Sequence, residues 1–119
     1  IRNPPREDVI QAYRESRFLV YPSRWELSPL TPLEAFAFKK TVISTTAHGI
    51  PYTIQHNKNC LLVESDNANL LSESILTLID NEKKCNDLGV SGHNMVLETC
   101  NAKQMVKNTL NMYEQLIKE

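Results

Sequence analysis

Two glutamates flank a stretch of chain that could bind an anion and a set of hydroxyl groups. Seven residues separate Glu26 from Glu34. Between them, Ser28 and Thr31 are each followed by a proline. Serine and threonine are favoured helix N-caps and proline suits the first helical position, so we expect a helix to begin here. A helix start presents unpaired backbone N–H groups and the positive end of the helix dipole, which together can bind phosphate.

The prolines decide which backbone groups could bind that anion. Pro29 and Pro32 carry no N–H, which leaves the amides of Leu30, Thr31 and Leu33 as donors. The flanking carboxylates would repel a phosphate. They suit sugar hydroxyls instead, because an ionised carboxylate accepts the hydrogen bonds that hydroxyls donate. The sequence therefore predicts an amide site for negatively charged oxygen, with an acid on each side that binds hydroxyls.

A simpler interpretation of the second acid is a capping box. Thr31 would then be the N-cap, Pro32 the first helical residue and Glu34 the third. Glu26 alone would be a solvated loop charge. The functional interpretation depends on the order of the whole stretch, in which a strand end, both acids, a helix start and a second strand follow one another.

Three short strands are expected to position this stretch. Residues 18–21 form an apolar run, residues 41–45 are β-branched as buried parallel strands are, and residues 60–63 make a third run. Ligands of parallel sheets bind beyond the carboxyl ends of the strands. We therefore expect the Glu26 loop and the 46–51 loop to face one crevice.

Helices should alternate with these strands, which predicts an α/β fold with a Rossmann-like parallel sheet and helices on both faces. Asp66 is the expected N-cap of one helix. Another helix is expected to be interrupted or bent near Gly89 and Gly92. Asn57 or Asn59 is expected to take a positive φ in a polar turn. Besides the helix that follows Thr31, the expected helices are 6–16, 67–81, 82–97 and 102–118, with a short helical turn at 52–55.

The central stretch resembles the C-terminal, donor-binding domain of GT-B glycosyltransferases of the family 4 type. That family carries a Pro-Ser strand end, a Glu, seven residues and a second Glu followed by Ala, here Pro22-Ser23, Glu26, Glu34 and Ala35. The resemblance implies that Glu26 contacts the transferred sugar without acting as a nucleophile. It also implies that Glu34 holds the ribose hydroxyls of the nucleotide.

The same resemblance implies the rest of the donor site. The diphosphate would lie on the backbone N–H groups of the helix start. The family's glycine pair beside the donor sugar corresponds to His48-Gly49. His48 could line the sugar pocket there, although an exposed loop imidazole is its simpler interpretation. With Glu26 as the catalytic residue, the donor-binding residues are then Glu34, Leu30, Thr31, Ser28, Ser23, Gly49 and His48.

Three positions depart from the family pattern. Many members have Phe-Gly where this chain has Ser28-Pro29, so one backbone donor toward the sugar is lost. Tyr52 stands where the family has a Glu, and Cys60 stands where it has a glycine before a strand. We interpret Cys60 as a small packing residue, because no histidine partner that would make it a nucleophile is evident.

The resemblance covers essentially the whole chain but only part of an enzyme. Residues 1–119 would be a single partial donor-binding domain, without the preceding strands and the acceptor-binding N-terminal domain. The helix at about 102–118 could pack on that missing domain. The full protein would then be a hexosyltransferase-like, retaining enzyme that moves a sugar from a nucleotide-diphosphate sugar to an acceptor glycan or lipid-linked sugar. The amides would stabilise the leaving diphosphate with no cofactor and no required metal. The chain alone is expected to transfer nothing.

Composition excludes several other classes. Lys and Arg total 13 and Asp and Glu 14, so no basic excess indicates a nucleic-acid partner. No apolar run is long enough to span a bilayer and no signal peptide is evident, which suggests the cytoplasm or its membrane surface. Three widely spaced cysteines predict reduced thiols. The three histidines have no metal-ligand spacing, so no zinc site is expected.

Two alternatives remain from other functional classes. One is a non-catalytic nucleotide-sugar-binding module that serves a partner chain or has lost activity. The other is an unrelated doubly wound domain whose sheet serves packing or interaction. The absence of a Walker loop and of Gly-x-Gly-x-x-Gly disfavours ATPases and dinucleotide-binding enzymes.

Overall fold

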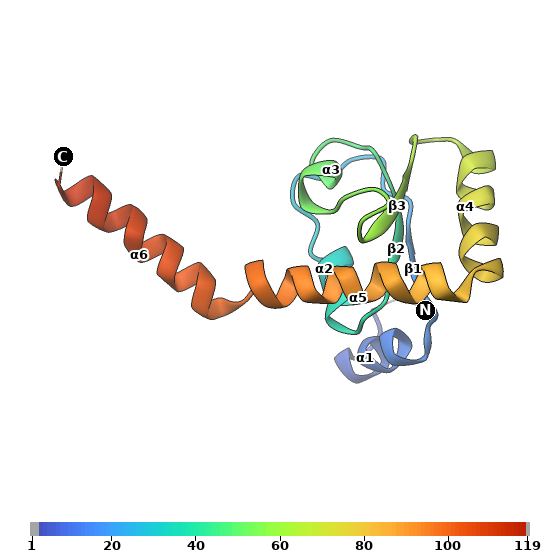
Figure 1. The fold of residues 1–119 in the computed structure, drawn as a ribbon, viewed down its shortest axis with the longest axis horizontal. Helices are drawn as coiled ribbons and strands as arrows, with labels where there is room; N and C mark the ends of the chain where they lie inside the picture. The colour runs from blue at the N-terminus through green and yellow to red at the C-terminus, as the bar shows by residue number, and fades with distance from the viewer. Residues whose placement is uncertain (1–2, 119) are drawn as a thin grey trace.

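A computed structural model of the chain describes residues 3–118 (Figure 1). A small three-stranded sheet lies at its centre, and helices precede, separate and follow the strands. The elements in order are α1 (Arg6–Glu15), β1 (Leu19–Tyr21), α2 (Thr31–Ala37), β2 (Val42–Thr45), α3 (Ile50–Thr53), β3 (Cys60–Val63), α4 (Ala68–Asp80), α5 (Glu82–Thr99) and α6 (Ala102–Lys118).

The sheet is parallel with the strand order β1-β2-β3. Successive residues of β2 point to opposite faces, so Val42 and Ile43 belong to different cores. Val42 packs with residues of α1, α2 and α3, whereas Ile43 packs with residues of α4 and the start of α5. In Figure 1, α2 and α3 lie on one side of the strands and α4 on the other. The predicted parallel sheet with helices on both faces is confirmed.

α5 runs without a break through its two glycines, so the predicted interruption is wrong. A Cβ at Gly89 would lie 2.3 Å from the backbone oxygen of Lys39. A Cβ at Gly92 would lie 2.4 Å from the ring of Phe36, which is fully buried. Both glycines therefore let α5 pack closely against α2 and the turn that follows it.

Helix caps differ from the prediction at α4. Asn67 caps this helix, because its side-chain oxygen accepts a hydrogen bond from the backbone N–H of Leu70 at 3.0 Å. Asp66, the predicted cap, takes a φ of 60° in the preceding turn instead. Asn57 has a φ of 58°, as expected for the polar turn before β3. The helical turn expected at 52–55 begins two residues earlier, at Ile50.

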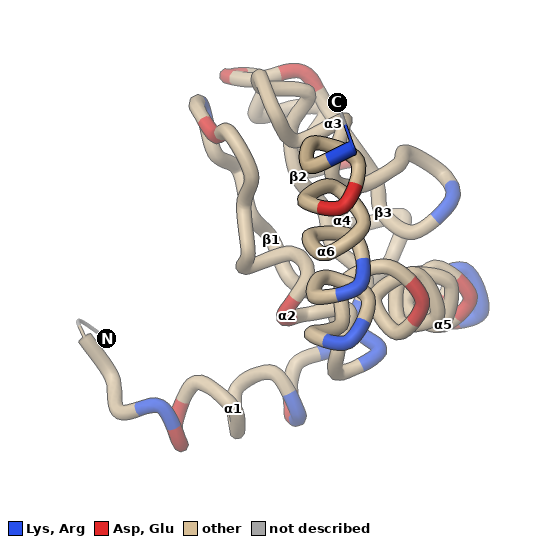
Figure 2. Tube along the Cα trace, turned by 90° about the vertical axis from the view of Figure 1, so that its left-hand side faces the viewer, with Lys and Arg blue, Asp and Glu red and all other residues tan. Residues whose placement is uncertain are grey.

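The last helix, α6, extends away from the body of the molecule (Figure 1). No residue of Ala102–Lys118 is buried, and its large apolar side chains are exposed. Basic and acidic residues are interspersed along α1, α5 and α6 (Figure 2). None of the helices within residues 3–118 combines the length and the apolar character needed to cross a membrane.

Candidate functional site

Glu34 lies in the first turn of α2, and a different side chain binds each of its carboxylate oxygens. The hydroxyl of Tyr13 donates a hydrogen bond to Oε2 at 3.1 Å. The guanidinium of Arg6 donates to Oε1 at 3.2 Å. Burial raises the pKa of Tyr13 to about 12, and the hydrogen bond to Glu34 adds to this rise. Both partners come from α1, an element in which no functional residue was expected.

Glu26 is held in a similar way in the loop after β1. The hydroxyl of Tyr21 donates to its Oε1, and the hydroxyl of Ser23 donates to the same oxygen at 3.3 Å. The hydrogen bond to Glu26 is the main cause that raises the pKa of Tyr21, followed by burial. Each of the two acids therefore accepts a hydrogen bond from one tyrosine hydroxyl.

Thr31 connects the two acid–tyrosine pairs. The hydroxyl of Tyr13 lies 3.5 Å from the backbone oxygen of Thr31. The Thr31 side chain lowers the pKa of Tyr21, against the larger effect of Glu26. The first residue of α2 therefore lies near both tyrosines.

The start of α2 is open but has no side-chain cap. Leu30 occupies the N-cap position, Thr31 is the first helical residue, and no side chain within residues 3–118 caps the helix. The predicted N-cap roles of Ser28 and Thr31 are therefore wrong, as is the capping box. Leu30 is 70% exposed and Ser28 is also exposed. Across residues 3–118, neither Leu30 nor Thr31 donates a backbone hydrogen bond.

The Glu26 loop and the His48 loop meet, as expected from the parallel topology. The backbone N–H of Gly49 donates to the backbone oxygen of Glu26 at 2.8 Å. The rings of Trp25 and His48 lie 5.8 Å apart. A Cβ at Gly49 would lie 1.7 Å from the backbone oxygen of Leu27. The space that the glycine leaves is thus filled by the neighbouring loop, and Gly49 holds the two loops together.

Side chains of β2 fix the end of β1. The hydroxyl of Ser44 donates to the backbone oxygen of Tyr21 at 2.8 Å, and that of Thr45 to the backbone oxygen of Ser23 at 2.6 Å. Both hydroxyl-bearing residues are buried. They set the direction in which the chain leaves the sheet toward Glu26.

Sequence reasoning missed Tyr13, Tyr21 and Arg6. Tyr13 lies in the expected helix 6–16 and Tyr21 ends the apolar run 18–21, so local patterns account for both without a function. The hydroxyl groups of the two tyrosines were the available sign of a further role, because a buried tyrosine hydroxyl needs a hydrogen-bond partner. For Arg6 the sequence offers no comparable signal.

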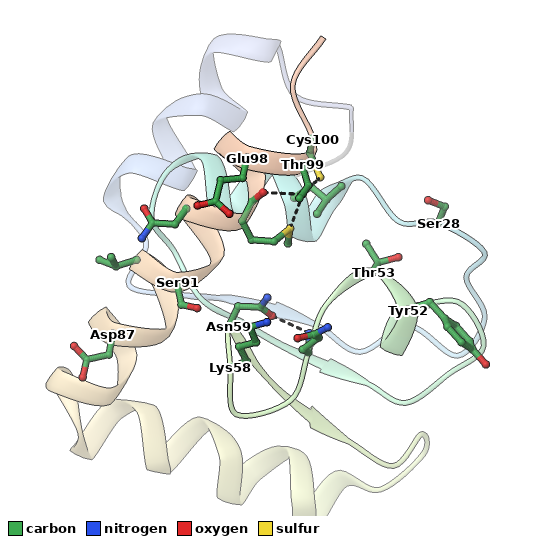
Figure 3. A pocket seen from close by; sticks show the side chains of 15 residues that line it. Ser28, Tyr52, Thr53, Lys58, Asn59, Asp87, Ser91, Glu98, Thr99 and Cys100 are labelled. Carbon is green, nitrogen blue, oxygen red and sulfur yellow. Dashed lines mark hydrogen bonds between the residues drawn. The ribbon is translucent and has the colours of Figure 1, made fainter. Parts of the chain in front are cut away.

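Two hollows lie near the candidate site without enclosing the acids. A groove of about 970 Å³ runs between α3, the turn before β3 and α5 (Figure 3), and Ser28 is the one candidate residue that lines it. A second hollow of about 420 Å³ lies at the carboxyl ends of the strands on the α4 side. The ion pair between Arg24 and Asp66, 2.6 Å long, lies on its rim.

Cysteine and histidine side chains do not form a reactive or metal-binding cluster. All three cysteines are free thiols. Burial raises the pKa of Cys60 to about 12, which fits a packing residue in the core. In the part of the chain that the structure describes, no three His, Cys, Asp or Glu side chains are grouped to hold a metal ion.

Known proteins are similar to this chain in sequence and in fold. The family model for glycosyl transferases group 1 matches residues 1–95. An uncharacterized glycosyltransferase of Methanocaldococcus jannaschii is 38% identical over 86 residues, which make up 72% of this chain and 24% of that protein. Sucrose-phosphate synthase from Thermosynechococcus elongatus is 26% identical with a TM-score of 0.85, covering 94% of this chain and 28% of the synthase.

A solved C-terminal domain gives a further match. The C-terminal domain of a glycosyl transferase group 1 family protein (LpcC) from Francisella tularensis is 26% identical with a TM-score of 0.76, covering 82% of this chain and 50% of that one. The chain thus has the fold of part of the C-terminal domain of a GT-B glycosyltransferase. It spans about a quarter of the length of the archaeal relative and of the synthase. Because the family match extends over most of its length, the chain belongs to the glycosyl transferases group 1 family.

Proposed function

We propose that this chain is the donor-binding portion of a retaining glycosyltransferase of the family 4 type. The whole protein would transfer a hexose from a nucleotide-diphosphate sugar to an acceptor. Glu34 binds the ribose hydroxyls of the donor nucleotide and Glu26 binds the transferred sugar. The backbone N–H groups of Leu30 and Thr31 bind the diphosphate between them.

One observation carries this proposal: Glu26 lies in the loop that leaves the carboxyl end of β1, Glu34 lies in the first turn of the helix that this loop enters, and within residues 3–118 the backbone N–H groups of Leu30 and Thr31 at that helix start donate no backbone hydrogen bond. Ligands of parallel α/β sheets bind at this edge. The side chain of Glu34 is 37% exposed, so its carboxylate can accept hydrogen bonds from a ligand. A diphosphate at the helix start would place a ribose on one side and a sugar on the other, where the two acids are.

The leaving diphosphate is stabilised by fixed dipoles in this scheme. Backbone N–H groups at a helix start are directed toward the ligand before the reaction begins, so they need no reorganisation as negative charge develops. Glu26 orients the sugar and takes no part as a nucleophile. The scheme requires no metal ion and no cofactor. Ser23 and Ser28 complete the polar lining beside the diphosphate, and His48 and Gly49 bring the second loop to the sugar.

The acceptor would bind to an N-terminal domain outside this chain, as a glycan or a lipid-linked sugar. α6 supports this division, because it exposes apolar side chains along its length and buries none within this chain. We infer that α6 packs on that other domain. The reaction would take place in the cytoplasm or at the cytoplasmic surface of the membrane.

Calorimetric binding of UDP, GDP and ADP, to this chain and to the complete gene product, tests the donor site. Glu34→Gln keeps the shape of the side chain but removes its charge. We expect a Kd at least tenfold higher for the nucleotide that binds, because hydrogen bonds to charged groups contribute about 1.5–3 kcal/mol. Glu73→Gln, on the exposed surface of α4, is the matched control and should leave the Kd unchanged.

Glu26→Gln separates binding from transfer. We expect it to leave nucleotide diphosphate binding within twofold of the parent and to lower sugar transfer by the complete gene product at least tenfold. Binding without transfer in the unmodified complete protein would instead identify a non-catalytic binding module. An unchanged Kd in Glu34→Gln would contradict the proposed donor site.

A further inference from the structure

We propose that Tyr13 is the positioning residue of the donor site, holding the Glu34 carboxylate by one oxygen so that the other oxygen meets the ribose hydroxyls. This inference rests on the proposed function and adds a residue of α1 to the site. It assigns a role to a side chain that lies 21 positions before Glu34 in the sequence.

Tyr13 is anchored by its ring and acts through its hydroxyl. The residue is 7% exposed and belongs to the core between the sheet and its helices. Its ring stacks on that of Phe38, with centroids 5.4 Å apart and planes within 9° of parallel. A phenylalanine at position 13 would provide the same ring. The hydroxyl is therefore the part of the side chain that serves Glu34.

The hydroxyl fixes the carboxylate relative to the helix start. It lies 3.1 Å from Oε2 of Glu34 and 3.5 Å from the backbone oxygen of Thr31. A carboxylate on a helix could rotate about its last torsion, which is broad for glutamate. One hydrogen bond from a rigid, buried donor selects an orientation and leaves Oε1 directed away from Tyr13.

Arg6 occupies the other oxygen, Oε1, but in a way that a ligand can displace. It contacts Oε1 through one nitrogen at 3.2 Å, and its side chain is 60% exposed. An exposed ion pair of this kind contributes little to stability, because water and salt screen it. Ribose hydroxyls can therefore replace Arg6, whereas they cannot replace the buried Tyr13. The two partners of Glu34 thus have different roles.

The test compares ribonucleotides with nucleotides that lack the hydroxyls. We would measure the Kd of UDP, GDP and ADP and of their 2′,3′-dideoxy counterparts for the complete gene product and its Tyr13→Phe variant. Loss of one hydrogen bond that orients the carboxylate should raise the Kd of the ribonucleotide about three- to tenfold. The Kd of the dideoxynucleotide should stay within twofold. Glu73→Gln, on the exposed surface of α4, is the control and should change neither value.

Arg6→Gln and Glu34→Gln complete the experiment. Arg6→Gln should leave ribonucleotide affinity unchanged or improve it, because it removes a competitor for Oε1. In the Glu34→Gln background, Tyr13→Phe should have no further effect, because the oriented group is gone.

Each failure has a distinct meaning. Equal weakening of ribonucleotide and dideoxynucleotide by Tyr13→Phe would show a structural role and overturn the inference. An unchanged ribonucleotide Kd in Tyr13→Phe, with a raised Kd in Glu34→Gln, would overturn the role of Tyr13 and leave the donor site intact. An unchanged Kd in Glu34→Gln would overturn the donor site and this inference together.

Discussion

At the scale of single residues, the two acids of the proposed donor site already accept hydrogen bonds from side chains of this chain. Glu26 is paired with Tyr21, and Glu34 is paired with Tyr13. Carboxylates near an anion-binding site must be prevented from turning toward the anion, because like charges repel. A fixed hydroxyl on each acid does this without adding charge. The hydrogen bonds to the two acids also raise the pKa values of Tyr13 and Tyr21.

The raised pKa of Tyr13 predicts that the folded protein loses stability at alkaline pH. Its pKa is about 12 in the folded protein against 10.0 for the free side chain, so the folded state binds the proton more tightly. This contribution is fully present below pH 10 and disappears as the pH rises to 12. The unfolding free energy of the parent, relative to Tyr13→Phe, should fall by roughly 2 kcal/mol over that range. Urea unfolding at pH 8, 10 and 11.5 measures the difference.

The difference between the parent and Tyr13→Phe reports the ionisation of Tyr13 alone. Cys60, with a pKa of about 12, ionises over the same pH range in both proteins, so its contribution cancels. Tyr113→Phe, which alters an exposed tyrosine, should follow the parent at every pH. Parallel curves for the parent and Tyr13→Phe would contradict the prediction.

At the scale of elements, close backbone approach positions the site more than caps do. α2 begins without a side-chain cap and is held from outside, by α1 through Glu34 and by α5 through its glycines. The two site loops are joined by Gly49, where any side chain would collide with the backbone of Leu27. These glycines allow neighbouring elements to pack closely. The effect of replacing one of them on stability therefore depends on which atoms of the neighbouring element lie against it.

Gly92→Ala tests this view of α5. In an isolated helix the change would stabilise by about 1 kcal/mol. Here the new methyl group would meet the fully buried ring of Phe36, and overpacking of this kind costs about 1–3 kcal/mol. The difference between the two effects is a net loss of up to about 2 kcal/mol, which urea unfolding measures.

The control is Asn86→Ala, which lies on the exposed side of the same helix and should change stability by less than about 0.5 kcal/mol. A Gly92→Ala protein as stable as the parent, or more so, would show that α5 can shift away from α2.

At the scale of the whole molecule, the chain consists of a packed α/β unit and one projecting helix. The two core clusters lie within residues 9–96, and α6 contributes no buried residue to them. The principal extents of 54 × 31 × 31 Å reflect this projecting helix. Isolated helices of this length are marginal in water, and the proposed packing of α6 on another domain would account for its order.

Ending the chain at Cys100 should therefore leave the packed unit intact. We expect the urea midpoint to match that of the full chain, while the helical signal in circular dichroism falls by the share of the 17 residues of α6. The physical reason is that burial of apolar surface dominates stability, and α6 buries little within this chain. A lower midpoint would mean that α6 supports the core, and would weaken the inference that it packs on another domain.

The sequence by itself determined the element order, the parallel sheet covered on both faces and the family, because periodicity and the motif around the two glutamates are local in the chain. Tertiary structure decided how those glutamates are held. The partners of Glu34 lie 21 and 28 positions earlier, and local patterns carry no information about such distant pairs. It also decided the role of Gly92, where a local rule predicts a bend and the crossing of α5 over Phe36 requires a residue without a side chain.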